Sequence, residues 1–155
     1  MFDVRAKSKA ITITNFYLTL VELTDLKIEI YTKVGSHLSY SENPDEWETV
    51  GKFSVDGDVK YSPQILPYDS ITTPQTIGKW QTRAFYITSS NSSSFYVTKG
   101  SNYSKMKKPL VQNSDLKILE GCSLSHIFDN KWGECKESDG GESYNLWGGV
   151  EYYLT

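Results

Sequence analysis

Few residues in this chain have side chains that could carry chemistry, and its two cysteines are the most informative of them. Cys122 and Cys135 flank a segment rich in Gly, Ser, Asp and Glu. The pair is compatible with free thiols, with half of a metal site or with a disulfide. A zinc site needs more nitrogen or sulfur ligands, and only His126 lies between the cysteines. We expect a disulfide, which would stabilise the fold by about 3 kcal/mol and place the protein outside a reducing cytosol.

Residues suited to acid–base or nucleophilic catalysis are scarce. The histidines are His37 and His126, and neither lies in a nucleophile elbow, a zinc-protease helix or a paired-cysteine motif. His126 and Asp129 could form a base with its orienting carboxylate, but an exposed loop histidine is the simpler interpretation. An enzyme would need a pocket in which a histidine meets a carboxylate. No Gly-rich phosphate loop follows a strand, so we expect a protein without catalytic activity.

Aromatic side chains offer a different chemistry, because flat apolar rings can stack on sugars at a low cost in conformational entropy. The chain has 4 Trp and 11 Tyr. Rings in or beside loops are the candidates for carbohydrate binding, and we select Trp80, Trp132 and Tyr144. Trp47 and Trp147 adjoin predicted strands, so we expect them in the core or at its edge.

Acidic and amide side chains in the loops define two further candidate sites. Hard oxygen ligands for calcium occur at Asp56, Asp58, Asp139 and Glu142. These residues do not have the spacing of an EF-hand, and acidic turn residues are usually solvated, so calcium is a candidate cofactor only. Two glycosylation sequons, at Asn91 and Asn102, fit a secreted protein.

The elements that would position these residues are strands. Leu26, Ile28 and Ile30 alternate with polar residues, as a strand with one buried face requires. About nine short segments show this pattern, and none has convincing helical periodicity. The apolar set changes parity between Ile13 and Phe16, which predicts a bulge near 14–15. Residues 57–80 look like a loop. The pattern predicts an all-β fold, a two-sheet antiparallel β-sandwich of the jelly-roll or Greek-key type.

Length and charge limit the remaining possibilities. A chain of 155 residues suits one domain with a hydrophobic core. The net charge of −3 does not indicate the basic surface that nucleic-acid-binding proteins usually have. We interpret the basic cluster at Lys105, Lys107 and Lys108 as a solvated loop. No apolar run approaches the roughly 20 residues that a membrane span needs. No secretory signal opens the chain, so we expect it to be removed or to lie outside this sequence.

Six motifs that follow one another along the chain carry a resemblance to a known type of domain. They are residues 1–7 (MFDVRAK), 28–33 (IEIYTK) with Gly35-Ser36, 43–47 (NPDEW), 83–88 (RAFYIT), 113–121 (NSDLKILEG) and 147–153 (WGGVEYY). With these motifs the chain resembles β-sandwich modules of predicted secreted and cell-surface proteins, common in diatoms and also found in bacterial exported proteins. The resemblance covers nearly the whole chain and implies the fold and an extracellular setting, but no common activity or site residues.

Two details of the resemblance concern particular segments. In these modules the Met-Phe-Asp segment usually lies inside a longer chain, which implies that Met1 is a processed or internal position. The chain departs from the pattern between Gly121 and Tyr144, where the modules have a shorter connection without a cysteine pair. The resemblance therefore implies nothing about that loop.

These observations lead to one expected function and one alternative. We expect one β-sandwich domain over 1–155, with an inserted cysteine-bracketed loop at about 121–144. Its expected function is that of a non-catalytic structural or adhesive module of a cell surface, matrix or filament, with copies of itself or other surface components as partners. Strands close to both ends of the chain would leave edges that recruit a neighbour. The alternative is a lectin-like module that binds polysaccharide, with calcium assisting.

Overall fold

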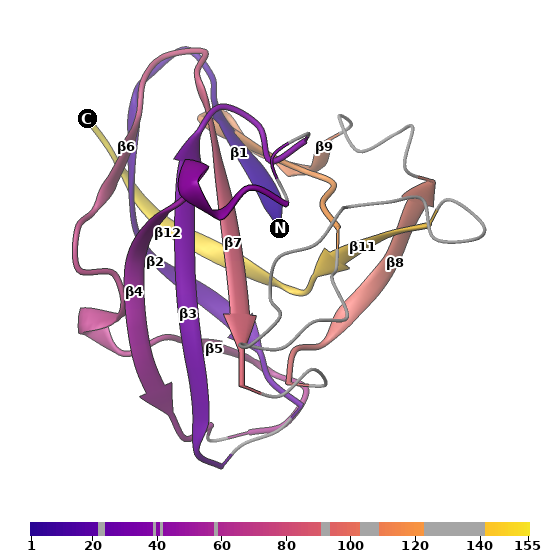
Figure 1. The fold of residues 1–155 in the computed structure, drawn as a ribbon. Helices are drawn as coiled ribbons and strands as arrows, with labels where there is room; N and C mark the ends of the chain where they lie inside the picture. The colour runs from indigo at the N-terminus through magenta and orange to yellow at the C-terminus, as the bar shows by residue number, and fades with distance from the viewer. Residues whose placement is uncertain are drawn as a thin grey trace.

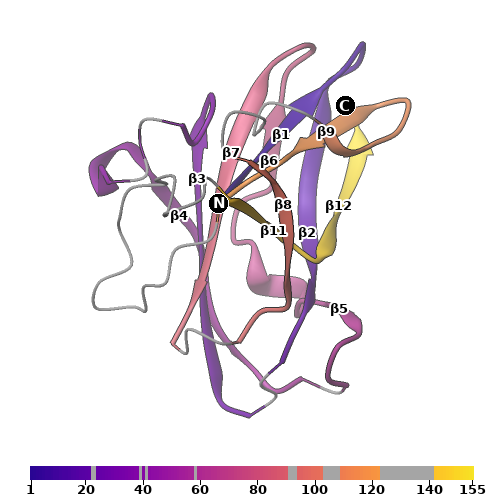
Figure 2. The same ribbon diagram turned by 90° about the vertical axis from the view of Figure 1, so that its right-hand side faces the viewer.

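The structure is a computed structural model in which all of the regular elements described are strands and two short 3-10 turns. It describes residues 1–21, 24–38, 40, 42–57, 59–90, 94–102, 109–122 and 142–155. The fold is all-β, with antiparallel sheets packed against one another as in a β-sandwich (Figure 1). Figure 2 shows the two main layers from the side. Among the described residues, no helix is long and apolar enough to span a membrane.

The first layer is a six-stranded sheet, and the second layer is a four-stranded sheet. The first has the order β4-β3-β7-β1-β10-β9, formed by β4 (Glu48–Val55), β3 (Leu26–Val34), β7 (Thr82–Ser89), β1 (Phe2–Ala6), β10 (Leu116–Leu119) and β9 (Pro109–Gln112). The second has the order β12-β2-β5, formed by β12 (Gly148–Leu154), β2 (Ile11–Thr19) and β5 (Pro63–Ile65), and β6 (Gln75–Ile77) also pairs with β2. A separate ribbon joins β8 (Val97–Asn102) to β11 (Glu142–Leu146).

The alternation that predicted β3 is present in the structure. Leu26, Ile28 and Ile30 are buried between the layers, while Lys27 is exposed. The core between the sheets includes the rings of Phe2, Phe16 and Phe85, whose centroids lie 5.1 to 6.1 Å apart. Burial of such side chains is the main favourable term in folding.

The bulge predicted in β2 is confirmed. Asn15 pairs with Glu151 and Ile13 pairs with Tyr152, so Thr14 is an extra residue in β2. The buried Asn15 side chain donates to the backbone oxygen of Leu66 at 2.9 Å. The extra residue reverses which positions of the strand face the core. Ile13 and Phe16 are therefore both buried, although one has an odd and the other an even position in the sequence.

Three expectations about the strands need correction. The N-terminal strand is not an edge, because β1 pairs with β7 on one side and β10 on the other. The described part of the chain contains twelve strands, where about nine were expected. Two of the additional strands, β5 and β6, lie within residues 57–80, which were expected to form a loop. Each has three residues, too few for a period of two to be recognisable.

Candidate functional site

The structure brings one histidine together with a carboxylate, the arrangement that an enzyme would require. His37 lies in the loop after β3, and Asp3 lies in β1, 34 positions away. The ring Nδ1 of His37 is 2.7 Å from Asp3 Oδ1, and the backbone N–H of His37 donates to the same oxygen at 2.9 Å. The Ser36 hydroxyl donates to Asp3 Oδ2 at 2.5 Å. Sequence reasoning did not include Asp3, because only the strand order brings it near the loop.

This cluster is closed to solvent. His37 is 0% exposed, and its Nε2 has no hydrogen-bond partner among the described residues. Burial alone raises the pKa of Asp3, but the hydrogen bonds and charge of His37, together with the hydrogen bond from Ser36, outweigh it, so the pKa lies below 3.8. A substrate cannot reach either side chain in this arrangement. The cluster instead attaches the loop after β3 to the outer face of the six-stranded sheet.

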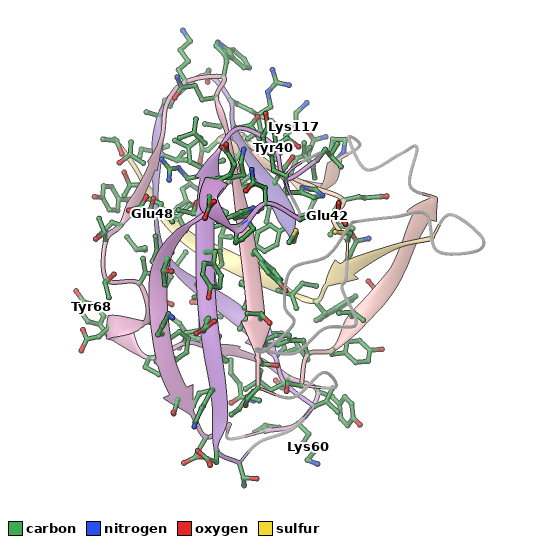
Figure 3. The ribbon with its side chains drawn as sticks, in the orientation of Figure 1. Tyr40, Glu42, Glu48, Lys60, Tyr68 and Lys117 are labelled. Atoms are coloured by element: carbon green, nitrogen blue, oxygen red, sulfur yellow. The ribbon has the colours of Figure 1, made fainter. Side chains whose placement is uncertain are left out.

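A second, smaller apolar cluster continues this attachment. Trp47 is buried in this cluster on the outer face of the sheet, beside Tyr31 and Tyr86, which agrees with its expected place in the core or at its edge. Its indole N–H donates to the backbone oxygen of Tyr40 at 2.9 Å. The Lys33 ammonium lies 3.8 Å from the centroid of the Tyr40 ring, which Figure 3 labels near one end of β3. This face of the sheet therefore has a structural role.

Exposed aromatic rings gather elsewhere, where β8 and β11 join the sandwich. Trp147 is 52% exposed, so it does not lie in the core, and of its two expected places, the core or the edge of the core, only the edge is compatible with the structure. Its ring is 6.3 Å from that of Tyr96, which is 6.0 Å from the ring of Tyr61. The backbone N–H of Trp147 donates to the oxygen of Tyr96 at 3.1 Å, which fixes the two residues side by side.

An apolar groove adjoins these rings, between the edges of the two main sheets. Leu110 and Val111 of β9 line one side of it, and Tyr17 of β2 and Val150 of β12 line the other. β9 and β12 lie near each other on the same side of the molecule in Figure 2. Gly148 also lines the groove and directly follows Trp147 in the chain. We give the name apolar surface to the exposed side chains of the groove and to the rings of Tyr96 and Trp147. Its residues are Tyr17, Tyr96, Leu110, Val111 and Trp147.

Trp80, a predicted sugar-binding residue, is 56% exposed but lies far from these rings. Its backbone N–H donates to the oxygen of Lys7, just before β2. The N–H of Tyr61 donates to the oxygen of Leu20, just after β2. β2 has nine residues, a length of about 30 Å. Trp80 and Tyr61 therefore lie at opposite ends of the sandwich.

The other predicted site residues stay predictions. Trp132, Cys135, Asp58, Asp139 and Asn91 lie outside the described residues. Cys122 is buried, and its backbone N–H donates to the oxygen of Met1 at 2.9 Å, but its pairing with Cys135 is not tested. For Tyr144, Glu142 and Asn102 the described part is the backbone, in β11 for the first two and at the end of β8 for the third.

Of the expected calcium ligands, Asp56 is the one whose side chain lies within the described part of the chain, so the calcium site stays a prediction. Asp56 accepts a hydrogen bond from the backbone N–H of Asp25 at 2.8 Å, as a turn residue commonly does. No group of three or more His, Cys, Asp or Glu side chains there could hold a metal ion.

Comparison with known proteins adds no relative. No protein family, no curated protein and no solved structure matches this chain.

Proposed function

We propose that this chain is a non-catalytic structural or adhesive module that works outside the cell and assembles with copies of itself through the apolar surface. The observation that carries the proposal is the continuity of this surface. The groove between the two sheets extends to Gly148, and the preceding residue, Trp147, has an exposed ring. Contiguous exposed apolar groups of this kind mark interaction sites in soluble proteins.

The edge strands support self-assembly. In the described part of the chain, β9 and β12 each end their sheet, so one side of each backbone is available for pairing. All four residues of β9 are exposed and none is charged. The opposite edge, β4, carries Glu48 and Lys52, charges that discourage pairing. We therefore assign the contact between copies to β9 and the groove beside it.

Other parts of the proposal depend on the sequence. The resemblance to secreted modules, the cysteine pair and the two sequons support the extracellular setting and the jelly-roll topology. The enclosure of His37 and Asp3 supports a role without catalysis, because this pair does not face solvent. Carbohydrate binding is a second candidate function, favoured by the exposed ring of Trp80.

Sedimentation velocity of the full chain over a range of concentrations tests the proposal. We expect the wild type to form dimers or larger assemblies as its concentration rises, and Leu110→Lys/Val111→Lys to remain monomeric, because two buried like charges would oppose the contact. Tyr68→Lys is the control. Tyr68 is 94% exposed and lies on the 3-10 turn Tyr68–Ser70, away from β9 (Figure 3). A wild type that stays monomeric, or a double variant that still associates, contradicts the proposal.

A further inference from the structure

Three turns meet at the end of the sandwich opposite Tyr61. The first joins β1 to β2, the second joins β6 to β7, and the third joins β9 to β10, at the top of Figure 1. The N–H of Trp80 and that of Ala6 link the first two turns, donating to the oxygens of Lys7 and Gln81 at 3.0 Å each. The N–H of Lys7 donates to the oxygen of Asp115 in the third turn at 2.7 Å. Segments far apart in the sequence thus form one tip.

Cations dominate this tip. They come from the turns and from the strand ends beside them, and we call them the basic tip: Arg5, Lys7, Lys9, Lys79 and Lys117. Asp115 is the acidic residue of the third turn, and it accepts a hydrogen bond from the Tyr152 hydroxyl at 3.0 Å. The whole chain has a net charge of −3. Its overall charge therefore gives no indication of a positively charged region such as the basic tip.

Two of the cations face each other directly. Arg5 and Lys117 are partners in the register of β1 and β10. Like charges at directly opposed positions destabilise a sheet. Neither side chain forms a salt bridge within the described residues. The repulsion is relieved if an anion binds between them.

The backbone of Trp80 is a second source of unfavourable energy at this tip, besides the repulsion between Arg5 and Lys117. Its φ of 61° is in the left-handed region, which a bulky aromatic residue rarely adopts. The turn is closed by the N–H of Gln81, which donates to the oxygen of Gly78 at 2.9 Å, and the indole is left largely exposed. Backbone strain of this kind is concentrated at functional sites. Strain and exposure also occur together at Tyr61, so what distinguishes Trp80 is that several cations of the basic tip gather around its turn.

We propose that the basic tip binds an anionic polysaccharide, with the Trp80 ring stacked on a sugar and the lysines paired with its carboxylates or sulfates. The choice of a polysaccharide rests on the extracellular setting in the proposed function. The site does not use the apolar surface. A flat ring among cations matches a polymer in which each unit has an apolar ring face and an acidic group.

Affinity electrophoresis of the full chain through gels containing polygalacturonate tests this inference, with neutral dextran as the comparison polymer. The wild type is retarded by polygalacturonate. Trp80→Gly and Lys9→Gln/Lys79→Gln each weaken the interaction by about tenfold or more, since each removes one component of recognition. Added NaCl reduces the retardation of the wild type, because it screens exposed charges.

The chain contains a matched control for this site. Lys60 and Tyr61 repeat the Lys-aromatic pair at the opposite end, and Tyr61 also has a left-handed backbone, with a φ of 58°. Figure 3 labels Lys60 and Lys117 at opposite ends of the molecule. Lys60→Gln/Tyr61→Gly leaves the retardation by polygalacturonate unchanged.

Four results would overturn the inference. They are absence of retardation of the wild type, equal retardation of Trp80→Gly, loss of retardation in the control variant, and retardation by single-stranded DNA with the same dependence on Trp80. The unfolding midpoint of Trp80→Gly, which we expect to equal or exceed that of the wild type, shows that lost binding is not lost folding. Self-association of Trp80→Gly matches the wild type, so a failure here is distinct from a failure of the proposed function.

Discussion

Asp3 shows how one side chain can connect distant parts of this protein. Its two carboxylate oxygens accept hydrogen bonds from Ser36 and from the backbone of His37, and Nδ1 of the His37 ring lies within hydrogen-bond distance. Asp3 is in a strand near the middle of the six-stranded sheet, and its partners are in the loop that covers the sheet. A buried carboxylate is stable only with such partners. The position of the loop therefore depends on this residue.

We predict that Asp3→Asn destabilises the protein by about 3 kcal/mol at neutral pH, because the amide lacks the charge and one of the acceptor oxygens that the buried donors require. Ser36→Ala, which removes one hydrogen bond, should cost about 1 kcal/mol. Urea unfolding followed by circular dichroism measures both effects. An Asp3→Asn variant as stable as the wild type would show that the cluster does not hold the loop.

The same residue predicts a dependence on pH. The pKa of Asp3 is lowered in the folded state relative to its ordinary value of 3.8. Its contribution to stability is therefore present above pH 3.8 and is lost as the pH falls through the lower pKa of the folded state. The stability difference between the wild type and Asp3→Asn should shrink over that range in urea unfolding at several acidic pH values. A difference that stays constant below pH 3.8 contradicts this assignment.

At the scale of the elements, the pairing of β12 with β2 depends on a close approach at Gly148. A Cβ atom added at this position would lie 2.0 Å from the backbone oxygen of Tyr17. No rotation of a side chain relieves that overlap, because the obstacle is main chain. At Gly149, the nearest atoms to an added Cβ are those of the Tyr17 side chain at 3.9 Å, an ordinary contact.

We predict that Gly148→Ala destabilises the protein by about 2 to 3 kcal/mol, while Gly149→Ala stays within about 0.5 kcal/mol of the wild type. The physical reason is that Gly148→Ala must separate two strands that share backbone hydrogen bonds. Denaturant unfolding of the two variants side by side measures the difference. Equal stability of both variants would mean that β12 lies farther from β2 than the structure places it.

At the scale of the whole molecule, the two proposed surfaces share no residue but adjoin at the β9–β10 hairpin, where Lys117 pairs with Gln112, the residue after Val111. The apolar surface lies along one side of the sandwich, where β9 and β12 end their sheets. The basic tip is formed by turns at one end. A protein that self-associates at one surface and binds a polymer at the other can cross-link that polymer, because linked sites raise the effective concentration.

We predict that the wild type raises light scattering when mixed with polygalacturonate. Leu110→Lys/Val111→Lys should still bind the polymer in affinity electrophoresis but should scatter much less, because each copy then offers a single site. Trp80→Gly should bind the polymer about tenfold more weakly or worse, and its scattering should fall accordingly. If the double lysine variant scatters as strongly as the wild type, the two surfaces do not act together in this way.

The sequence by itself determined the features that depend on neighbouring residues. The alternation of Leu26, Ile28 and Ile30 predicted β3, and the change of parity after Ile13 predicted the bulge in β2. These predictions succeed because a strand has a local period of two, so a few consecutive residues report which face is buried.

Only the tertiary structure decided which distant residues become neighbours. Arg5 and Lys117 meet because β1 pairs with β10, and Asp3 meets His37 because the loop after β3 folds over β1. The basic tip joins three cations from residues 5–9 to Lys79 and Lys117, which come from two other segments of the chain. The basic cluster at 105–108 lies outside the described residues. Strand order and register fix such contacts, and a hydrophobic period carries no information about which strands will pair.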